Sequence, residues 1–566
     1  MTSRAATGPI DPPVVGNVAL TGRVVTMGSA ADVRESATVW IANSRIQAIT
    51  APGDPVPAGF TGVHPVVTKG TIYPGLIDLH NHLPYNVLPL WQVPKRYTNR
   101  DQWGSGSNPQ YRPLISGPMG ILGRPEYLPA VVRYVEAKAL LGGSTTTQGI
   151  KLFSDIHGGQ RYYRGVVRNV EQTDEPDLPE GATRIADVDA DLIVAFDKLI
   201  RKPKKLLLHL SEGTDDTARN HFLALKLPVE VAQAEGRVWA LSPSLVGIHC
   251  AALKTPDFAA MGTAGASMVW SPMSNLLLYG ATSDVATARD HGLPIGLGPD
   301  WSPSGSKNLL GEMKAAFALS RLDRPDAFVS PFEIVSMVTT NAAHMIGWGE
   351  QVGRLQPGFL ADLIVVKGAT GDPFEHLLRA AETDLSLVMI NGVARYGLSA
   401  LVSARTNAPA SESIKVGGAA RRLNLAHVTA DPAIGTITLA QARSVLTATM
   451  LDLPQLEHTP VTPAVARAVA RAGGPASTGG PQWRLALDEL VDTGQVLRTR
   501  FHYRNRRTAP RLDEWVGASR AATPLPLRPL TLDPLTVADD DSFLDRLAGQ
   551  TNLPAGFAAA LAALYV

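Results

Sequence analysis

The sequence predicts an α/β protein built around a β/α barrel, and two observations favour that fold. Short apolar runs alternate with helical stretches through the middle of the chain, which is typical of parallel strands joined by crossover helices. Polar or ionisable residues gather at the carboxyl end of each apolar run. In a barrel, this is the end at which active sites lie.

Segments with the alternation of β-strands flank this middle region. The first extends from Val18 to Ile49, and the second begins at Gly353–Val366 and ends near Gly397. Their period of two and their β-branched residues predict strands, so the two flanks are able to complete one sheet. Beyond about Leu401, Ala, Arg, Pro and Thr dominate; two stretches there predict helices, and none carries a functional motif.

Length, charge and cysteine content limit the classes of function. A chain of 566 residues is longer than a single hydrophobic core normally supports, which predicts two or three structural units. The net charge of +1 with interspersed signs disfavours nucleic-acid binding and a polybasic membrane anchor and favours a small-molecule substrate. Cys250 is the only cysteine, which excludes an intrachain disulfide and a cysteine zinc cluster.

The same features predict where the protein works. The amino-terminal segment lacks the apolar core of a signal peptide, and no uncharged apolar run has membrane-spanning length. We expect a soluble, cytoplasmic protein without membrane partners. Assembly into a homo-oligomer is compatible with the sequence.

The first chemical motif is His80-Asn81-His82, at the end of the run IYPGLIDLH. On a strand the period of two directs both imidazoles to one side, and two such nitrogens suit a divalent metal such as zinc. Two histidines hydrogen-bonded at a surface turn would give the same motif.

Three further strand ends carry residues of the same kind. His209 follows an apolar run with Glu212 just beyond it, His249 ends another run, and Asp300 follows a Gly-rich stretch. Each has a structural alternative, since a single histidine is often a core residue and Asp300 suits a helix cap. Together they form the pattern by which barrels build active sites.

These residues lie in a series of motifs that resembles the amidohydrolase superfamily. The motifs cover roughly Val18 to Gly397, and in chain order they are TIYPGLIDLHNH, STTTQG, HLSEG, GIHC, SPMSNLLL, GLGPD with LLGEMK, and GRLQPGFLADLIVV. The series looks most like cytosine, guanine and S-adenosylhomocysteine deaminases and triazine hydrolases, with imidazolonepropionase close by. An ordered series is far more specific than any single motif.

The resemblance implies a TIM (β/α)8 barrel, with a composite β-sandwich made from both flanks and a C-terminal extension. The predicted units are 1–73 as the first part of the sandwich and 74–350 as the barrel. Residues 351–400 form the second part of the sandwich, and 401–566 form an extension of unknown role.

The resemblance also implies roles for the site residues. The residues that match the family's ligands for one divalent metal, zinc first with iron or manganese as alternatives, are His80, His82, His209 and Asp300. Glu212 matches a proton-shuttling acid and His249 a histidine that orients water or substrate, so the predicted catalytic residues are Glu212, His249 and Asp300. A metal lowers the pKa of its bound water towards ~7, and a nearby carboxyl can protonate a leaving nitrogen.

The predicted substrate contacts come from two segments. Ser274 and Asn275 match a Ser-Asn pair of the family, and Trp91 and Trp103 lie in a long insertion after His82 that suits stacking on a planar ring. Each also has a structural reading, as a turn or as loop packing on the barrel rim.

Two departures from the family pattern concern the substrate. Many deaminases have a His-x-Pro pattern where this chain reads Trp270-Ser271-Pro272, and the segment from Arg168 to His209 is short and lacks a substrate-contacting histidine. Lys151 follows the second predicted strand rather than the fourth, which disfavours a metal-bridging lysine, although His249 is able to hold a second metal.

The sequence therefore predicts a hydrolase that uses a metal-activated water on a non-peptide carbon–nitrogen bond, by deaminating a heterocycle or opening a cyclic amide. Removal of another leaving group such as halide is one alternative. A barrel protein without turnover is another.

Overall fold

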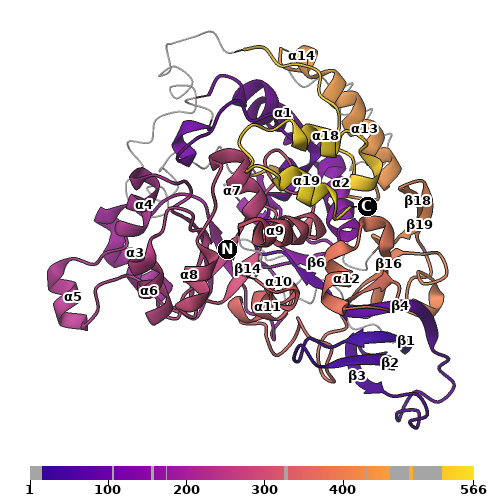
Figure 1. Ribbon diagram of the computed structural model, residues 1–566. Helices are drawn as coiled ribbons and strands as arrows, with labels where there is room; N and C mark the ends of the chain where they lie inside the picture. Colours follow the sequence, from indigo (N-terminus) through magenta and orange to yellow (C-terminus); the bar gives the residue numbers. More distant parts are fainter. Residues whose placement is uncertain are drawn as a thin grey trace.

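The computed structural model describes residues 16–104, 108–154, 159–173, 175–323, 329–426, 431, 433–458, 483–487 and 525–565. Figure 1 follows the chain from its indigo amino-terminal strands to its yellow carboxy-terminal helices. Strands and helices alternate through the middle of the chain, which confirms the predicted α/β class. Within the described ranges no helix is both long enough and apolar enough to cross a membrane.

A nine-stranded sheet joins the two flanks of the chain, in the order β18-β19-β17-β16-β15-β4-β1-β2-β3. Its strands are β1 (Val18–Val25), β2 (Val33–Ala42), β3 (Arg45–Thr50), β4 (Val66–Pro74), β15 (Leu363–Lys367), β16 (Leu385–Ile390), β17 (Val393–Gly397), β18 (Glu412–Val416) and β19 (Ala419–Leu423). The flanks meet where β4 pairs antiparallel with β15, with Ile72 opposite Val365. The expectation of one shared sheet is confirmed, and this sheet continues beyond residue 400 through β18 and β19.

Eight strands between the flanks form two parallel sheets, β5-β6-β9 and β10-β11-β12-β13-β14, while β7 (Lys151–Ser154) and β8 (Gly159–Tyr162) pair antiparallel in a small separate sheet with β20 (Trp483–Leu485). The eight parallel strands are β5 (Leu76–Ile77), β6 (Ser144–Thr147), β9 (Arg168–Asn169), β10 (Ala182–Arg184), β11 (Leu206–Leu210), β12 (Leu245–His249), β13 (Ser267–Trp270) and β14 (Ile295–Leu297). Two contacts connect the parallel sheets. Gly181 donates its backbone N–H to the Val170 carbonyl at 2.8 Å just before β10, and Asn81 forms a parallel bridge with Asp300.

The apolar runs predicted as strands are buried on both faces. Every residue of β11 and β12 is buried, as expected of parallel strands covered on both sides. Side chains of β5, β11, β12 and β13 share one core cluster, which includes Ile77, Leu207, Val246 and Val269. Because side chains on one side of a strand recur every second residue, Leu207 in this core places His209 on the same side, one step nearer the strand's carboxyl end.

The carboxy-terminal residues cover helices of the middle region. Helix α13 (Leu439–Leu451) packs on α2 (Leu128–Leu141), and α19 (Phe557–Ala562) packs on α9 (Leu309–Asp323). Figure 1 shows the yellow segment with α18 (Phe543–Ala548) and α19 lying across this side of the molecule. All 14 residues of α2 are buried, because the extension covers the face that a surface helix would expose to solvent.

Candidate active site

The four predicted metal ligands converge at the carboxyl ends of three parallel strands. His80 and His82 follow β5, His209 lies in β11, and Asp300 follows β14. The Asp300 carboxylate oxygen Oδ1 is 3.2 Å from His80 Nε2 and 3.3 Å from His82 Nε2, and His82 Nε2 is 3.3 Å from His209 Nε2. We call these four residues with Glu212 and His249 the strand-end cluster.

The backbone at this cluster departs from regular strand geometry. Four non-glycine residues at or just after the ends of β11, β12 and β14 have positive φ angles: Ser211 (53°), His249 (67°), Cys250 (53°) and Asp300 (67°). Such conformations cost energy and persist where the surrounding structure imposes them, often at functional sites. At His249 the positive φ interrupts the strand alternation, so the imidazole direction does not follow from the pattern of β12.

The donor atoms in the cluster fit a divalent cation. Ligand atoms of His80, His82 and His209 lie within 4.8 Å of one another, and the same holds for His80 with His249 and Asp300. Among the described residues, the buried His80 Nδ1 has no hydrogen-bond partner. Imidazole nitrogens with one carboxylate are a donor set that suits zinc and related divalent metals.

Burial sets the charge states of these groups. It lowers the pKa of His80 to about 4, and it holds the pKa of His209 well below its ordinary value. Burial acts to raise the pKa of Asp300, but the charge of His80 and its hydrogen bond outweigh this effect and hold that pKa below its ordinary value. Near neutral pH, His80 and His209 are therefore neutral and Asp300 is ionised, the forms in which these side chains bind metals.

Glu212 and His249 lie on another side of the same cluster. Their nearest atoms, Oε2 and Nε2, are 3.7 Å apart, and ligand atoms of Glu212, His209 and His249 lie within 4.8 Å of one another. The Tyr279 hydroxyl donates to Glu212 Oε1 at 2.8 Å. One oxygen of Glu212 is thus fixed by a tyrosine while the other faces a histidine.

The predicted Ser-Asn pair contacts the cluster from helix α7 (Pro272–Tyr279). Ser274 donates its hydroxyl to Asp300 Oδ2 at 2.6 Å, and Asn275 Oδ1 lies 2.9 Å from His249 Nδ1. Both side chains are fully buried and orient cluster residues through these contacts.

The two predicted tryptophans differ in whether they contact residues next to the strand-end cluster. Trp91 is 3% exposed and packs against Tyr97 and Tyr111 within its own insertion. Trp103 is partly exposed and donates its indole N–H to the Tyr279 hydroxyl at 2.8 Å. The Trp103 ring also lies 5.7 Å from that of Trp301, so of the two tryptophans Trp103 is the one that contacts neighbours of the cluster.

Tyr279, Asp78 and Asn81 are cluster neighbours that the sequence prediction missed. Tyr279 lies four residues after Asn275 on α7, and residues at this spacing share a helix face. This spacing in the sequence therefore indicates that Tyr279 lies near the cluster. Asp78 accepts the backbone N–H of His80 at 3.1 Å and an amide hydrogen of Asn81 at 2.7 Å. In the sequence, the position of Asp78 two residues before His80, in the same motif, indicates that it lies near the cluster.

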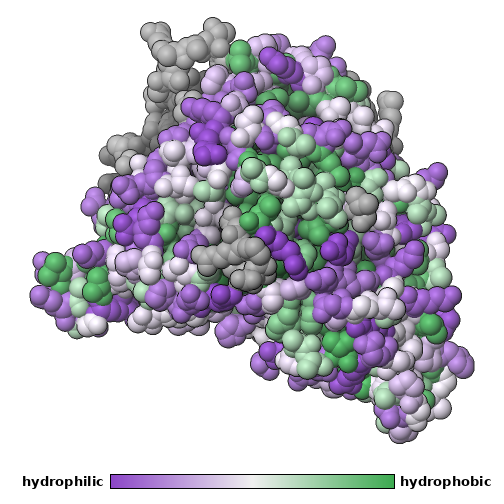
Figure 2. Space-filling view, in the orientation of Figure 1, coloured by the Kyte–Doolittle hydropathy of each residue, from purple (hydrophilic) through white to green (hydrophobic). Residues whose placement is uncertain are grey.

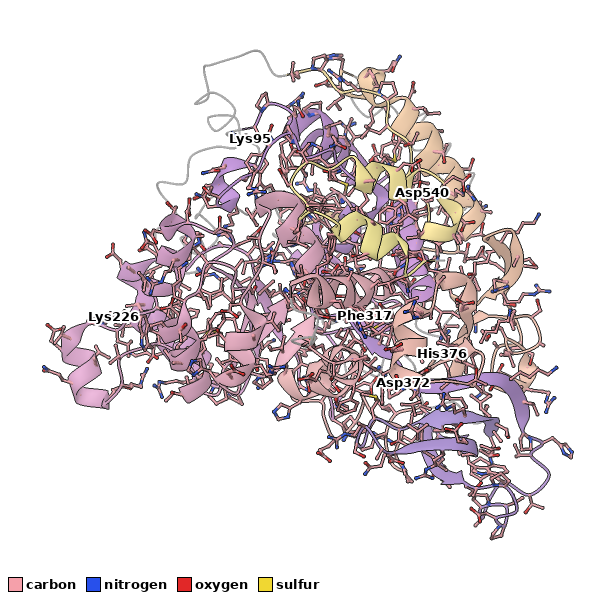
Figure 3. All side chains as sticks on the ribbon, viewed as in Figure 1. Lys95, Lys226, Phe317, Asp372, His376 and Asp540 are labelled. Atoms are coloured by element: carbon pink, nitrogen blue, oxygen red, sulfur yellow. The ribbon has the colours of Figure 1, made fainter. Side chains whose placement is uncertain are left out.

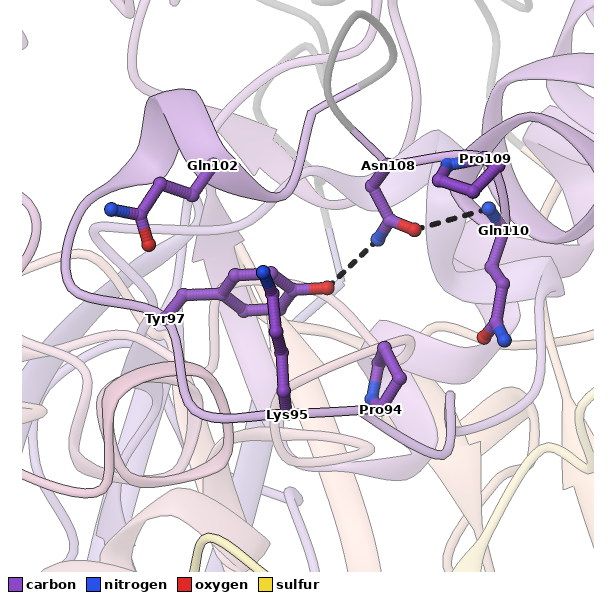
Figure 4. Close-up of a pocket in the computed structure, with 7 residues that line it drawn as sticks. All are labelled: Pro94, Lys95, Tyr97, Gln102, Asn108, Pro109 and Gln110. Atoms are coloured by element: carbon purple, nitrogen blue, oxygen red, sulfur yellow. Dashed lines mark hydrogen bonds between the residues drawn. The ribbon is translucent and has the colours of Figure 1, made fainter. Parts of the chain in front are cut away.

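A separate hollow opens on the insertion that follows His82. Figure 4 shows this pocket of about 190 Å³. Its lining residues are Pro94, Lys95, Tyr97, Gln102, Asn108, Pro109 and Gln110. Asn108 donates its side-chain amide to the Tyr97 hydroxyl at 2.9 Å. None of the six cluster residues lines this pocket, so the pocket is separate from the strand-end cluster.

Comparisons with known proteins agree with the motif series. The model of the amidohydrolase family matches residues 194–395. The 5-methylthioadenosine/S-adenosylhomocysteine deaminase of Syntrophobacter fumaroxidans is 31% identical over 205 residues, which are 35% of this chain and 46% of that protein. The enzyme of that name from Symbiobacterium thermophilum is 24% identical over 388 residues, 61% of this chain and 84% of that protein. The match thus spans just under half of the first relative and most of the second.

Solved structures extend the likeness to the fold. Guanine deaminase from Bradyrhizobium japonicum has a TM-score of 0.50 at 16% identity, covering 68% of this chain and 100% of that one. Atrazine chlorohydrolase from Arthrobacter aurescens has a TM-score of 0.51 at 19% identity, covering 67% and 94%. At these identities the likeness concerns the fold alone. Together the family model, the relatives and the shared fold confirm the resemblance of this chain to the amidohydrolase superfamily.

Proposed function

We propose that this protein is a metal-dependent hydrolase of a non-peptide carbon–nitrogen bond, acting by deamination of a planar heterocycle or by opening of a cyclic amide. The observation that carries the proposal is the strand-end cluster, in which three imidazoles and one carboxylate lie beside a second carboxyl, Glu212, within contact distance of His249. Hydrolysis of such a bond needs both an activated water and a group that delivers a proton to nitrogen.

We assign one divalent metal to His80, His82, His209 and Asp300, zinc first and iron or manganese as alternatives. The ion would supply Lewis acidity that activates water. The side chains of His80, His209 and Asp300 are at most 6% exposed, whereas that of His82 keeps 13% exposure. We therefore place the approach of water and substrate on the side of His82.

Proton transfer is assigned to the two carboxylates. Ser274 fixes Asp300 at Oδ2, and the ionised Asp300 is able to accept a proton from water. Glu212 is held at Oε1 by the Tyr279 hydroxyl, which leaves Oε2 to carry a proton to the leaving nitrogen. His249, which the Asn275 amide orients, faces the same oxygen and positions water or substrate there.

An aromatic wall beside His82 favours a planar substrate. The Trp301 ring lies 6.2 Å from the His82 ring and 5.7 Å from the Trp103 ring, and flat rings bind such surfaces by offset or edge contacts. We infer a heterocycle that stacks near Trp103 and presents its carbon–nitrogen bond to the cluster. The deaminase names of the sequence relatives point to purine derivatives as the first compounds to test.

The finer architecture belongs to the same proposal. We infer that the eight parallel strands form a TIM (β/α)8 barrel within 74–350, because the contacts of Gly181 with Val170 and of Asn81 with Asp300 connect the two parallel sheets. The ranges 1–73 and 351–400 are proposed as the two parts of a composite β-sandwich, with 401–566 as the extension.

Metal content followed by a substrate panel tests this proposal. We expect about one divalent metal per chain and ammonia release from at least one aminopurine, aminopyrimidine or cyclic amide. Protein that holds no metal, and gains no activity with zinc, iron or manganese, would overturn the proposal. Chloride release from a chlorinated ring without ammonia release from any panel compound would favour the halide-removing alternative.

A further inference from the structure

One buried carboxylate from the far end of the chain reaches the middle region. Asp533 is fully buried, and its two carboxylate oxygens accept hydrogen bonds from two lysines. Lys138 Nζ lies 2.5 Å from Oδ2 and Lys307 Nζ lies 2.6 Å from Oδ1. The segment is anchored beside this contact, since the Asp533 N–H donates to the Val87 carbonyl at 2.9 Å and the Tyr134 hydroxyl donates to the Asp533 carbonyl at 2.7 Å.

Lys138 connects this carboxylate to two segments of the site. Besides Asp533, its ammonium group donates to the Asn86 carbonyl and to the Ser302 hydroxyl, each at 2.8 Å. A lysine ammonium has three donors, so these three acceptors satisfy it completely. Asn86 follows His82 and Ser302 follows Asp300, and the Ser302 N–H also donates to Asn86 Oδ1 at 2.8 Å.

The hydrogen bonds continue from Asn86 to a predicted metal ligand. Asn86 donates its side-chain amide to Asn81 Oδ1 at 2.9 Å, and Asn81 donates to Asp78 Oδ2 at 2.7 Å. Asp78 in turn accepts the backbone N–H of His80 at 3.1 Å. A continuous series of buried contacts therefore runs from Lys138 to the backbone of His80.

The negative charge of Asp533 stabilises the buried ammonium groups of Lys138 and Lys307. Removing an ammonium group from water costs several kcal/mol unless an opposite charge compensates it, and Lys138 and Lys307 are both nearly inaccessible to solvent. Lys307 has a second partner in Asp540, at 2.8 Å. Asp533 is therefore the partner that balances Lys138.

We propose that Asp533 is a positioning residue of the strand-end cluster, acting through Lys138 to fix the segments that follow His82 and Asp300. The carboxy-terminal extension thus completes the metal site from outside the barrel, without contacting metal or substrate. The inference rests on the proposed metal site. Its consequence is that metal affinity depends on a charge 395 residues away in sequence from Lys138.

The test compares two carboxylates of the same segment in the full-length protein. Asp533→Asn removes the partner of Lys138. Asp540→Asn removes a buried carboxylate whose ion pairs are with Lys307 and Arg546, and whose charge acts on Lys138 more weakly than that of Asp533. Figure 3 labels Asp540 in the yellow segment. Each protein is stripped with a chelator and titrated with Co²⁺, whose visible absorption reports the ligand geometry, and thermal unfolding measures the stability lost in each variant.

We expect Asp533→Asn to weaken Co²⁺ affinity about 10-fold or more and to change the absorption band, because supporting contacts of metal ligands commonly contribute 10- to 100-fold in affinity. Asp540→Asn should keep the wild-type spectrum and affinity even where its melting temperature falls as far. Equal Co²⁺ behaviour of the two variants would overturn the inference.

A second variant decides the question if Asp533→Asn does not fold. Ser302→Ala breaks the same connection at its other end and leaves the extension intact; a shifted Co²⁺ spectrum supports the inference and a wild-type spectrum overturns it. Wild-type protein that binds no Co²⁺ is a distinguishable result, because it counts against the proposed metal site itself.

Discussion

The strand-end cluster and the carboxy-terminal contact at Asp533 are both buried and both charged, but they satisfy their charges differently. Asp533 has two lysines as direct partners, so its charge is balanced within the protein. The cluster gathers several imidazoles around one carboxylate, and His82 Nε2 lies 3.3 Å from His209 Nε2. Charges that are already paired within the protein hold a conformation, whereas we propose that the cluster receives a cation.

The largest expected effect comes from removing a ligand of the cluster. We expect His209→Ala to lose its metal and all measurable turnover while circular dichroism stays close to that of wild type, because the core beneath it, with Leu207 and Val246, is untouched. Elemental analysis and activity measure the two effects separately.

His221→Ala is the matched control, since His221 is a partly buried histidine that contacts Asp187 outside the cluster. It should keep both metal and activity. Normal metal occupancy and turnover in His209→Ala would remove His209 from the ligand set and weaken the contrast between the two regions.

A smaller effect is expected from the acid that we assign to proton transfer. Glu212→Gln keeps the size of the side chain and accepts the Tyr279 hydrogen bond, but it does not shuttle a proton, so turnover should fall on the order of 10²–10⁴-fold. Metal content should stay unchanged. The measurements are ammonia release with a substrate from the panel and metal per chain, with the exposed Glu235→Gln as control.

Two outcomes would change the assignment. Loss of metal in Glu212→Gln would make Glu212 a ligand together with His209 and His249, whose donor atoms also lie within 4.8 Å of it. Near-normal ammonia release would leave the deamination mechanism without its proton donor.

The two regions also differ in how far the sequence predicted them. His80, His209 and Asp300 were visible because each follows or ends an apolar run, and parallel strands bring their carboxyl ends together. The α/β class and the shared sheet followed from the same periodicities. The surroundings of Glu212 were less visible, because its contact with Tyr279 spans 67 residues.

Asp533 shows why the remainder was not predictable. It belongs to a stretch without a recognisable motif, and its partners Lys138 and Lys307 lie 395 and 226 residues away, so no local spacing relates it to them. Lys138 is buried because the carboxy-terminal segment packs over α2, and the periodicity of the sequence does not predict this packing. Similarly, the positive φ of His249 depends on its packing environment and is not encoded by the pattern of its strand.

The smallest expected effect concerns another buried carboxyl, Glu312 on α9, which accepts hydrogen bonds from two neutral donors. It accepts hydrogen bonds from the Met273 N–H and the Ser306 hydroxyl, and burial raises its pKa to about 8. Between the ordinary glutamate pKa, near 4.5, and about 8, the folded state therefore holds a proton that the unfolded state has lost. Because the folded state binds more protons there, Glu312 makes stability fall as pH rises through this window.

Glu312→Gln removes that titration and should flatten the decline in stability by on the order of 1 kcal/mol per pH unit. Urea unfolding at pH 5.5, 6.5 and 7.5 measures the effect, with the exposed Glu375→Gln as control. The variant should gain stability relative to wild type as pH increases. A difference between variant and wild type that stays constant with pH would mean that Glu312 is ionised in the folded protein, and therefore that neutral donors alone compensate a buried carboxylate here, as two lysines do at Asp533.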